Sequence, residues 1–168
     1  MTFVSYAQNQ EDVLLWRALR EVARGVYIDV GASDPVRDSV TKAFYDRGWS
    51  GVNIEPSAQA FAHLVAARPR DVNLNIAVSD HAGEITLFDV AGSGLSTSVR
   101  ANADALASSG ATVRSVVTPC QTLAAILARL EFPEVHFLKV DVEGAEEAAL
   151  RGVDFSTFRP WIILVEAT

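Results

Sequence analysis

The stretch Val26–Asp34, which reads VYIDVGASD, constrains the fold of this chain more than any other. Its first half is a short apolar segment with an acid, Asp29, near the end, which is typical of a strand in a buried sheet. Its second half is a turn of small residues. In an open parallel sheet, ligands bind outside the carboxyl end of a central strand, where such a turn lies. The stretch therefore predicts an α/β fold with a ligand site directly after this strand.

Strand and helix patterns alternate along the rest of the chain, as expected for a parallel sheet covered by helices. The patterns predict strands at Val26–Val30, Val52–Glu55, Val72–Val78, Glu84–Val90, Val113–Thr118, Val135–Val140 and Trp161–Glu166. They predict helices at Ser5–Arg24, Ser39–Arg47, Ala58–Arg68, Thr122–Leu130 and Ala145–Leu150, and a loop at Ala91–Ala111. The first helix is expected to start with a capping box. We therefore expect a doubly wound, mostly parallel sheet with helices on both faces.

Length and composition limit the class of protein. The 168 residues suffice for one domain, residues 1–168, which we divide into an N-terminal helix (1–24) and an α/β core (25–168). No apolar run is long enough for a membrane span, and the single cysteine, Cys120, excludes an internal disulfide. A chain with one cysteine and therefore no internal disulfide is typical of a reducing compartment, so we expect a cytoplasmic location. The net charge of −7 argues against a nucleic-acid partner, because phosphates attract basic surfaces.

The turn after Val30 indicates which cofactor fits. A dinucleotide site needs several glycines so that the backbone can approach a pyrophosphate, whereas this turn has only Gly31. Asp34 would repel a phosphate. A nucleoside cofactor without phosphate fits better, and S-adenosylmethionine is one, since carboxylates attract its positive sulfonium. A plain strand-to-helix turn and a nicotinamide-dependent oxidoreductase are the alternatives.

Two further strand ends carry polar residues suited to a nucleoside. Glu55 ends the second strand, where an acid accepts hydrogen bonds from ribose hydroxyls. Ser79 and Asp80 follow the third strand, at a place suited to an adenine amino group. A solvated acid before Pro56 and ordinary turn chemistry are the alternative interpretations.

The most unusual cluster is Lys139, Asp141 and Glu143, at alternate positions along the end of an apolar strand. Charged side chains at the end of a buried strand cost free energy unless they form ion pairs or bind a ligand. Ion pairs between Lys139 and either acid are the structural alternative to a ligand site. Glu166 ends the next strand at the same level and could complete a group of carboxylates around a reacting hydroxyl.

These residues resemble the FkbM-type S-adenosylmethionine-dependent methyltransferases, and the resemblance covers nearly the whole chain. It is carried by Ser5–Gln8 with Glu11-Asp12, Ile28–Ala32, Asp38–Thr41, Gly48–Pro56, Ala77–Asp80, Gly94–Thr97, Leu138–Glu146, Arg159-Pro160 and Glu166-Ala167. The resemblance implies a Rossmann-like class I methyltransferase fold with strand order 3-2-1-4-5-7-6. It also implies methyl transfer to a hydroxyl, commonly on a sugar, glycan or polyketide.

The resemblance also implies roles for residues. Asp29, Gly31 and Ala32 would hold the methionine part of the cofactor and Glu55 its ribose. Ser79 and Asp80 would lie near the adenine, and Asp141 and Glu143 near the methyl group and the acceptor.

Deprotonation of the acceptor requires a base, for which we expect Glu143 first and Glu166 second, with Lys139 orienting the carboxylates. A divalent metal held by Asp141 and Glu143 is the alternative. A scaffolding domain that binds the cofactor without turnover, within a larger glycan-biosynthesis protein, is the alternative function.

Members of the family usually continue into a terminal hairpin that completes the sheet, and this chain stops at Thr168. With the order above, Trp161–Glu166 would form an apolar sheet edge, and such edges are rarely left exposed. We therefore expect a downstream domain or a second copy of the chain to cover it.

Overall fold

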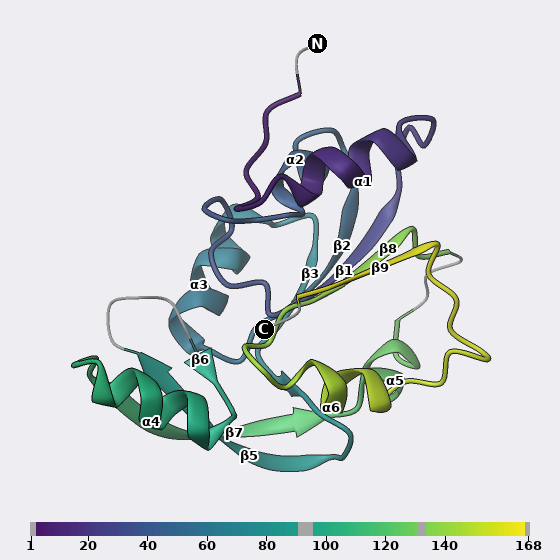
Figure 1. The fold of residues 1–168 in the computed structure, drawn as a ribbon. Coiled ribbons are helices and arrows are strands. Elements are labelled where there is room, and N and C mark those ends of the chain that lie inside the picture. The colour runs from purple at the N-terminus through teal and green to yellow at the C-terminus, as the bar shows by residue number, and fades with distance from the viewer. Residues whose placement is uncertain (1–2, 91–95, 131–133, 167–168) are drawn as a thin grey trace.

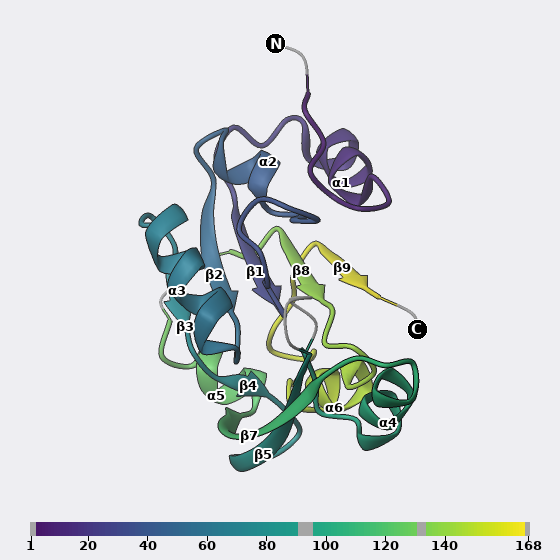
Figure 2. The ribbon, with the colours of Figure 1, turned by 90° about the vertical axis from the view of Figure 1, so that its left-hand side faces the viewer.

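The computed structural model describes residues 3–90, 96–130 and 134–166. Its larger sheet contains five parallel strands in the order β3-β2-β1-β8-β9 (Figure 2). The strands are β1 (Val26–Val30), β2 (Ser50–Ile54), β3 (Val72–Leu74), β8 (Phe137–Val140) and β9 (Ile162–Val165). The parallel sheet is therefore confirmed, and its order matches the first five positions implied by the family resemblance.

Alternation along the strands builds one apolar core on each face of this sheet. Tyr27 and Phe137 point to the face that is covered by α1 (Glu11–Leu19) and α2 (Lys42–Tyr45). Ile28 and its neighbours point to the other face, which packs against α5 (Leu123–Leu127) and α6 (Glu146–Arg151). Figure 1 shows the two helix layers on opposite sides of the strands. The expected arrangement of helices on both faces is confirmed.

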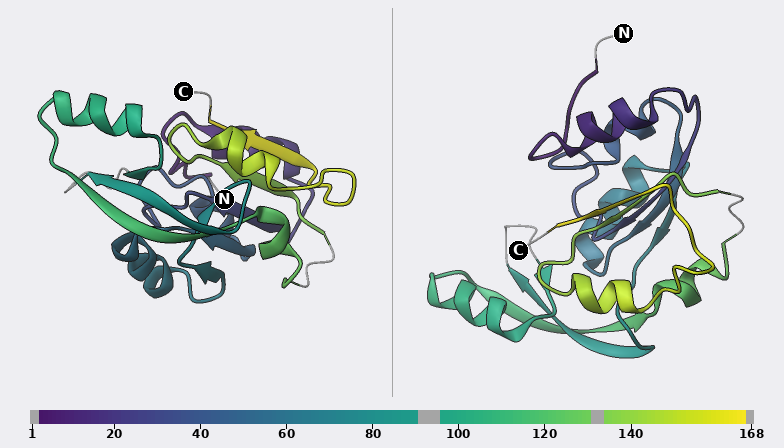
Figure 3. Two further views of the ribbon diagram at one scale, coloured as in Figure 1. Left: turned by 90° about the horizontal axis from the view of Figure 1, so that it is seen from below. Right: turned by 45° about the vertical axis from the view of Figure 1, so that its right-hand side comes forward.

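A second, four-stranded sheet lies across the carboxyl end of the first (Figure 3). Its order is β4-β7-β5-β6, with β5 antiparallel to both neighbours and β4 parallel to β7. The strands are β4 (Ala77–Val78), β5 (Gly83–Val90), β6 (Ser96–Thr97) and β7 (Val113–Gln121). The prediction of strands near residues 84–90 and 113–118 is confirmed.

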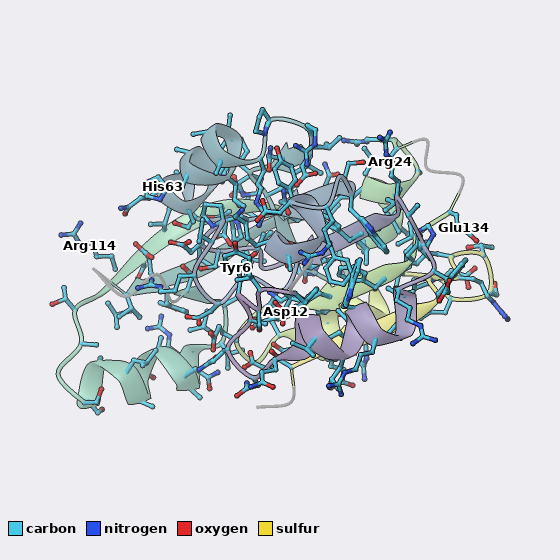
Figure 4. The ribbon with its side chains drawn as sticks, turned by 90° about the horizontal axis from the view of Figure 1, so that it is seen from above. Tyr6, Asp12, Arg24, His63, Arg114 and Glu134 are labelled. Carbon is cyan, nitrogen blue, oxygen red and sulfur yellow. The ribbon has the colours of Figure 1, made fainter. Side chains whose placement is uncertain are left out.

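The N-terminal helix is shorter than predicted, and no capping box starts it. Residues 3–10 form an irregular segment that is held by the buried carboxylate of Asp12 (Figure 4). Ser5 Oγ donates to this carboxylate at 2.7 Å, and the backbone N–H groups of Tyr6 and Ala7 donate to it at 2.7 and 3.3 Å. Ser5 therefore bonds to a side chain inside the helix instead of capping its start.

The predicted third strand, Val72–Val78, is divided between the two sheets. Residues 72–74 pair with β2 as β3, whereas Ala77 and Val78 pair with β7 as β4. Between them, Asn75 Nδ2 donates to the carbonyl oxygens of Glu55 and Pro56, at 2.9 and 3.0 Å. These bonds to the segment after β2 turn the chain from one sheet into the other.

The loop predicted at Ala91–Ala111 is wrong for most of its length. Residues 91–95 lie outside the described part of the chain, but β6 and the helix α4 (Arg100–Ser108) follow them. Alanine has the highest helix propensity, which favours a helix in this alanine-rich segment. The side chain of Ala103, within α4, is buried and anchors the helix.

The remaining helices fit their predictions more closely. Thr122 caps α5 as expected, since its Oγ1 accepts the N–H of Ala125 at 3.2 Å. The helix α3 (Ala58–Ala67) follows β2, as predicted. The helix α2 begins three residues later than predicted and ends two residues earlier, and α5 ends at Leu127 where the prediction extended to Leu130. No helix within the described ranges is long and apolar enough to cross a membrane.

Candidate functional site

A cavity of about 400 Å³ opens at the carboxyl ends of β1, β2, β8 and β9. This volume lies within the range of small-molecule sites. The second sheet contributes to the cavity wall through Ile85 and Leu87 of β5 and Ser96 of β6. The site thus lies where the sequence placed it, at the ends of parallel strands, but part of its wall comes from the smaller sheet.

The turn after β1 makes a very close contact with the segment after β8. Gly31 has a left-handed backbone (φ 77°), and a Cβ atom on it would lie 1.7 Å from the carbonyl oxygen of Asp141. The N–H groups of Gly31 and Ala32 donate to the carbonyl of Ile54 in β2, at 2.9 and 3.3 Å. Glycine is required here because two backbone segments meet, and Gly31 and Ala32 both line the cavity.

Lys139 joins this turn to the acids around it. Its buried ammonium lies 3.2 Å from Asp29 Oδ1 and 3.1 Å from Asp141 Oδ2, and it donates to the carbonyl of Gly31 at 2.7 Å. Burial lowers the pKa of Lys139, but Asp29 and Asp141 outweigh burial and raise it. The ion pair between Lys139 and Asp141, which the sequence left open as the structural alternative to a ligand site, is present. Lys139 thus holds two acids and the carbonyl of Gly31 in place.

Sequence reasoning missed the partner of the second Asp29 oxygen. Thr41 Oγ1 donates to Asp29 Oδ2 at 2.9 Å, and both residues are buried. Thr41 belongs to the motif Asp38–Thr41 that contributed to the family resemblance, but nothing in the local pattern connects it with β1. The contact depends on packing between segments that are twelve residues apart.

Glu55 follows β2 and lines the cavity with a nearly buried carboxylate. One oxygen accepts the N–H of Ser33 and the other accepts that of Ser57, each at 2.8 Å. Burial raises the pKa of Glu55, against these two hydrogen bonds, which lower it. Each oxygen retains acceptor capacity, because a carboxylate oxygen has two lone pairs. The side chain is therefore rigid and able to accept hydrogen bonds from a diol.

Ser79 and Asp80 do not line this cavity, although Ala77 and Val78 just before them do. Asp80 instead contacts His81 Nδ1 at 2.8 Å and accepts the Ser79 hydroxyl at 3.3 Å. The hydrogen bond from His81 lowers the pKa of Asp80. The structure thus separates these two residues from the other members of the predicted site, and their role near an adenine stays a prediction.

The carboxylates of Asp141, Glu143 and Glu166 converge beside Lys139, and all three residues line the cavity. One oxygen from each lies within 4.8 Å of the others, so the three could hold a divalent cation. A hydrogen bond with Asp141, followed by burial, raises the pKa of Glu166 to about 7. Burial raises the pKa of Glu143, and the charges of Asp141 and Glu146 raise it further. The predicted group of carboxylates is therefore brought together, and the pKa values of two of its members, Glu143 and Glu166, are raised.

Acidic side chains dominate the cavity and favour a cationic ligand. Seven carboxylates and two cationic side chains line it among the described residues. Asp34 is one of the seven, and it accepts the N–H groups of Val36 and Arg37, each at 2.8 Å. Burial raises the pKa of Asp34, but these bonds outweigh burial and lower it, so the group stays charged. Negative charge repels phosphates and attracts a sulfonium or an ammonium group.

Comparisons with known proteins place the chain in a family. The model of the Methyltransferase FkbM domain family matches residues 29–168. No curated protein sequence matches significantly. A solved structure of Methyltransferase FkbM from Methylobacillus flagellatus KT is similar over 77% of this chain, with 14% sequence identity and a TM-score of 0.47. The similar region makes up 29% of that longer chain, so this chain spans less than a third of it. The family match covers most of the sequence, and the chain belongs to the FkbM methyltransferase domain family.

Proposed function

We propose that the protein is an S-adenosylmethionine-dependent O-methyltransferase that acts on a hydroxyl of a sugar, glycan or polyketide-like acceptor. The observation that carries this proposal is the acid-lined cavity at the carboxyl ends of β1, β2 and β8. Family membership supports methyl transfer, and the residues around the cavity fit the cofactor. When bound, S-adenosylmethionine supplies a methyl group on a positively charged sulfur.

The cofactor-binding residues divide the cavity into two parts. Glu55 would accept hydrogen bonds from the ribose hydroxyls, since its two oxygens are held in place by Ser33 and Ser57. Asp29, Gly31 and Ala32 would hold the methionine part, with Asp29 fixed by Lys139 and Thr41. Asp141 lies on the same side as Lys139 and contributes negative charge near the sulfonium.

Glu143 and Glu166 are the candidate bases for the acceptor hydroxyl. Both residues line the cavity, and the pKa of each is raised toward neutral pH. A general base is most efficient when its pKa lies near the operating pH. Glu143 would take up the proton of the acceptor hydroxyl as the oxygen–carbon bond forms and the carbon–sulfur bond of the cofactor breaks, which releases the neutral thioether. Glu166 is the second candidate for this role. Lys139 limits repulsion between Asp29 and Asp141 and so keeps the acids in place.

A divalent metal at Asp141, Glu143 and Glu166 is the alternative way to activate the hydroxyl, and the convergence of these three carboxylates supports it. A panel of sugar acceptors would be tested for production of S-adenosylhomocysteine, with chelator and then with added magnesium. Loss of turnover with chelator, restored by magnesium, selects the metal route. Equal turnover with and without chelator selects the base.

Calorimetric titration with S-adenosylmethionine tests the proposed function directly. We expect binding that weakens about ten- to a hundredfold in Glu55→Ala, because a buried charged hydrogen-bond acceptor is lost. Glu84→Ala, which removes an exposed acid from β5, is the matched control and should bind normally. A wild-type protein that does not bind the cofactor would refute the methyltransferase reading. Binding without turnover on any acceptor would favour a scaffolding domain of a larger glycan-biosynthesis protein.

We also propose that another polypeptide segment, from a linked domain or a second copy of the chain, covers β9. Within the described ranges β9 pairs only with β8, and Trp161, Ile163 and Val165 are exposed. Slow amide exchange along β9 in the assembled protein would support this cover. Fast exchange in a fully active, monodisperse monomer would contradict it.

The single cysteine supports a cytoplasmic location, and the acidic charge supports a partner other than nucleic acid.

A further inference from the structure

The backbone of Glu143 has an unusual conformation for its residue type. Its φ of 55° lies in the left-handed region, and Gly144 after it also has a positive φ of 99°. A residue with a side chain loses about 1–2 kcal/mol in this region, so surrounding contacts must hold it there. Such contacts matter because Glu143 lines the cavity next to Asp141.

Two side chains from the second sheet and its helix hold the peptide group that follows Glu143. Thr97 Oγ1, at the end of β6, donates to the carbonyl oxygen of Glu143 at 2.8 Å. Asn102 Nδ2, on α4, donates to the same oxygen at 2.9 Å. Thr97 is buried, and its hydroxyl also accepts the N–H of Val99 at 3.0 Å, which fixes its direction. One carbonyl thus receives two donors from a segment more than forty residues away in sequence.

The other side of the same loop is held by α6. Glu146 Oε1 accepts the N–H groups of Val142 and Gly144, at 2.9 and 3.1 Å. Asn102 packs directly against the loop, since a Cβ atom on Gly144 would lie 2.7 Å from Asn102 Nδ2. Figures 1 and 2 show α4 and α6 both below the main sheet. The loop is therefore clamped between its own helix and the β6–α4 segment.

We propose that Thr97 and Asn102 are positioning residues, which hold Glu143 in its left-handed conformation and thereby aim its carboxylate into the cavity toward Asp141 and Glu166. The same segment forms part of the cavity wall, because Ser96 and Ser98 on either side of Thr97 line it. The β6–α4 segment thus contributes both to the cavity wall and to the orientation of the proposed base. The consequence for catalysis rests on the proposed function, whereas the conformation of Glu143 does not.

Matched variants separate the two hydrogen bonds from general stability. Thr97→Val removes the hydroxyl and keeps the shape, whereas Thr97→Ser keeps the hydroxyl and is the rescue variant. Asn102→Ala removes the second donor and serves if Thr97→Val does not fold. Ser108→Ala is the control, since it removes an exposed hydrogen bond to Asp104 on the same helix, away from the loop.

Nuclear magnetic resonance reads the conformation directly, because a positive φ brings the amide proton and Hα of one residue unusually close. We expect a strong intraresidue amide–Hα contact at Glu143 in the wild type, Thr97→Ser and Ser108→Ala. We expect it to weaken in Thr97→Val and Asn102→Ala. An unchanged contact in both of these variants would overturn the proposal, since Gly144 and Glu146 would then suffice.

The second readout is the preference for the cationic cofactor over its neutral product. Calorimetry gives the ratio of affinities for S-adenosylmethionine and S-adenosylhomocysteine, which differ by the methyl group and the positive charge. Turning Glu143 away removes negative charge from the cavity, so we expect this ratio to fall about two- to fivefold in Thr97→Val and to recover in Thr97→Ser. A wild type that binds neither compound refutes the proposed function. An unchanged ratio in Thr97→Val instead refutes the proposal that Thr97 orients the Glu143 carboxylate into the cavity.

Discussion

Lys139 Nζ lies 3.2 Å from Asp29 Oδ1 and so joins residues that face each other in the register of β1 and β8. Both side chains are nearly buried, and Asp141 lies 3.1 Å from the same ammonium. The pair brings a positive charge between two acids at the carboxyl ends of two adjacent strands. All three residues line the cavity.

Replacing this lysine should destabilise the fold strongly. In Lys139→Met the charges of Asp29 and Asp141 lose their counterion, and breaking a buried pair typically costs about 3–5 kcal/mol. Urea denaturation measures the loss. Lys42→Met is the control, because its pair with Asp46 is more exposed and should contribute less than about 1 kcal/mol. Equal losses in the two variants would show that Lys139 does not hold the site together.

A methyl group on Gly31 should damage the site more than one on another left-handed glycine. The added Cβ would lie 1.7 Å from the carbonyl of Asp141, so the β1 and β8 segments would have to separate. Gly48 has a similar φ of 87° but open space around its Cβ position. We expect Gly48→Ala to cost about 1–2 kcal/mol and Gly31→Ala at least about 1–3 kcal/mol more. Thermal unfolding of the two variants compares them, and similar values would contradict the close contact.

Stability should depend on the protonation of Glu166. The folded protein raises the pKa of this group from 4.5 to about 7, so the folded state binds its proton more tightly than the unfolded state does. The resulting stabilisation is fully present below about pH 4.5 and is lost as the pH rises through about 7. Glu166→Gln removes this contribution. Urea unfolding at several pH values between about 4.5 and 8 should therefore show a smaller decline in the variant than in the wild type. Parallel pH profiles would exclude the raised pKa.

The effect of Asp141 falls outside this window. Burial raises the pKa of Asp141, but the hydrogen bond with Glu166 and the charge of Lys139 outweigh it, and the pKa is lowered from 3.8. Its stabilising contribution is therefore present above about pH 3.8 and is lost as the pH falls below that value. The difference in unfolding free energy between the wild type and Glu166→Gln above about pH 4.5 therefore reports on the proton of Glu166.

Arg68 should support the cavity from a distance. Its buried guanidinium donates to the carbonyl of Pro35 at 2.6 Å and to Ser39 Oγ at 3.0 Å, at the end of the loop that carries Asp34. Arg68→Met leaves the buried carboxylate of Asp71 without its cation, and we expect a loss of about 3–5 kcal/mol together with weaker cofactor binding.

The conservative variant and a neighbouring arginine sharpen this test. Arg68→Lys should recover little, because an ammonium cannot reproduce the fork of donors. Arg70→Met removes an exposed arginine that donates to the carbonyl of Tyr45, and its effect should be below about 1 kcal/mol. Normal cofactor affinity in a stable Arg68→Met protein would separate the arginine from the site.

Local sequence patterns were enough to predict the parallel sheet and most of its polar strand ends. Apolar strands such as Phe137–Val140 can only be buried on both faces, so alternation with helices was enough to predict a parallel sheet. Because parallel strands all end at one edge, it also followed that Asp29, Glu55, Asp141 and Glu166 would meet there. These conclusions need only local patterns and the direction of the chain.

Which partner each polar group takes depends on how the chain packs after folding. Ser5 has the local signature of a helix cap, but its hydroxyl donates to Asp12 inside the helix instead. The strand predicted at Val72–Val78 is divided between two sheets at Asn75, which donates to the carbonyl of Glu55. Thr41 on Asp29, and Thr97 with Asn102 on Glu143, join segments whose proximity depends on how the layers pack. A hydrogen bond acts over about 3 Å, whereas sequence patterns report burial and direction, so contacts of this kind become visible only in the folded chain.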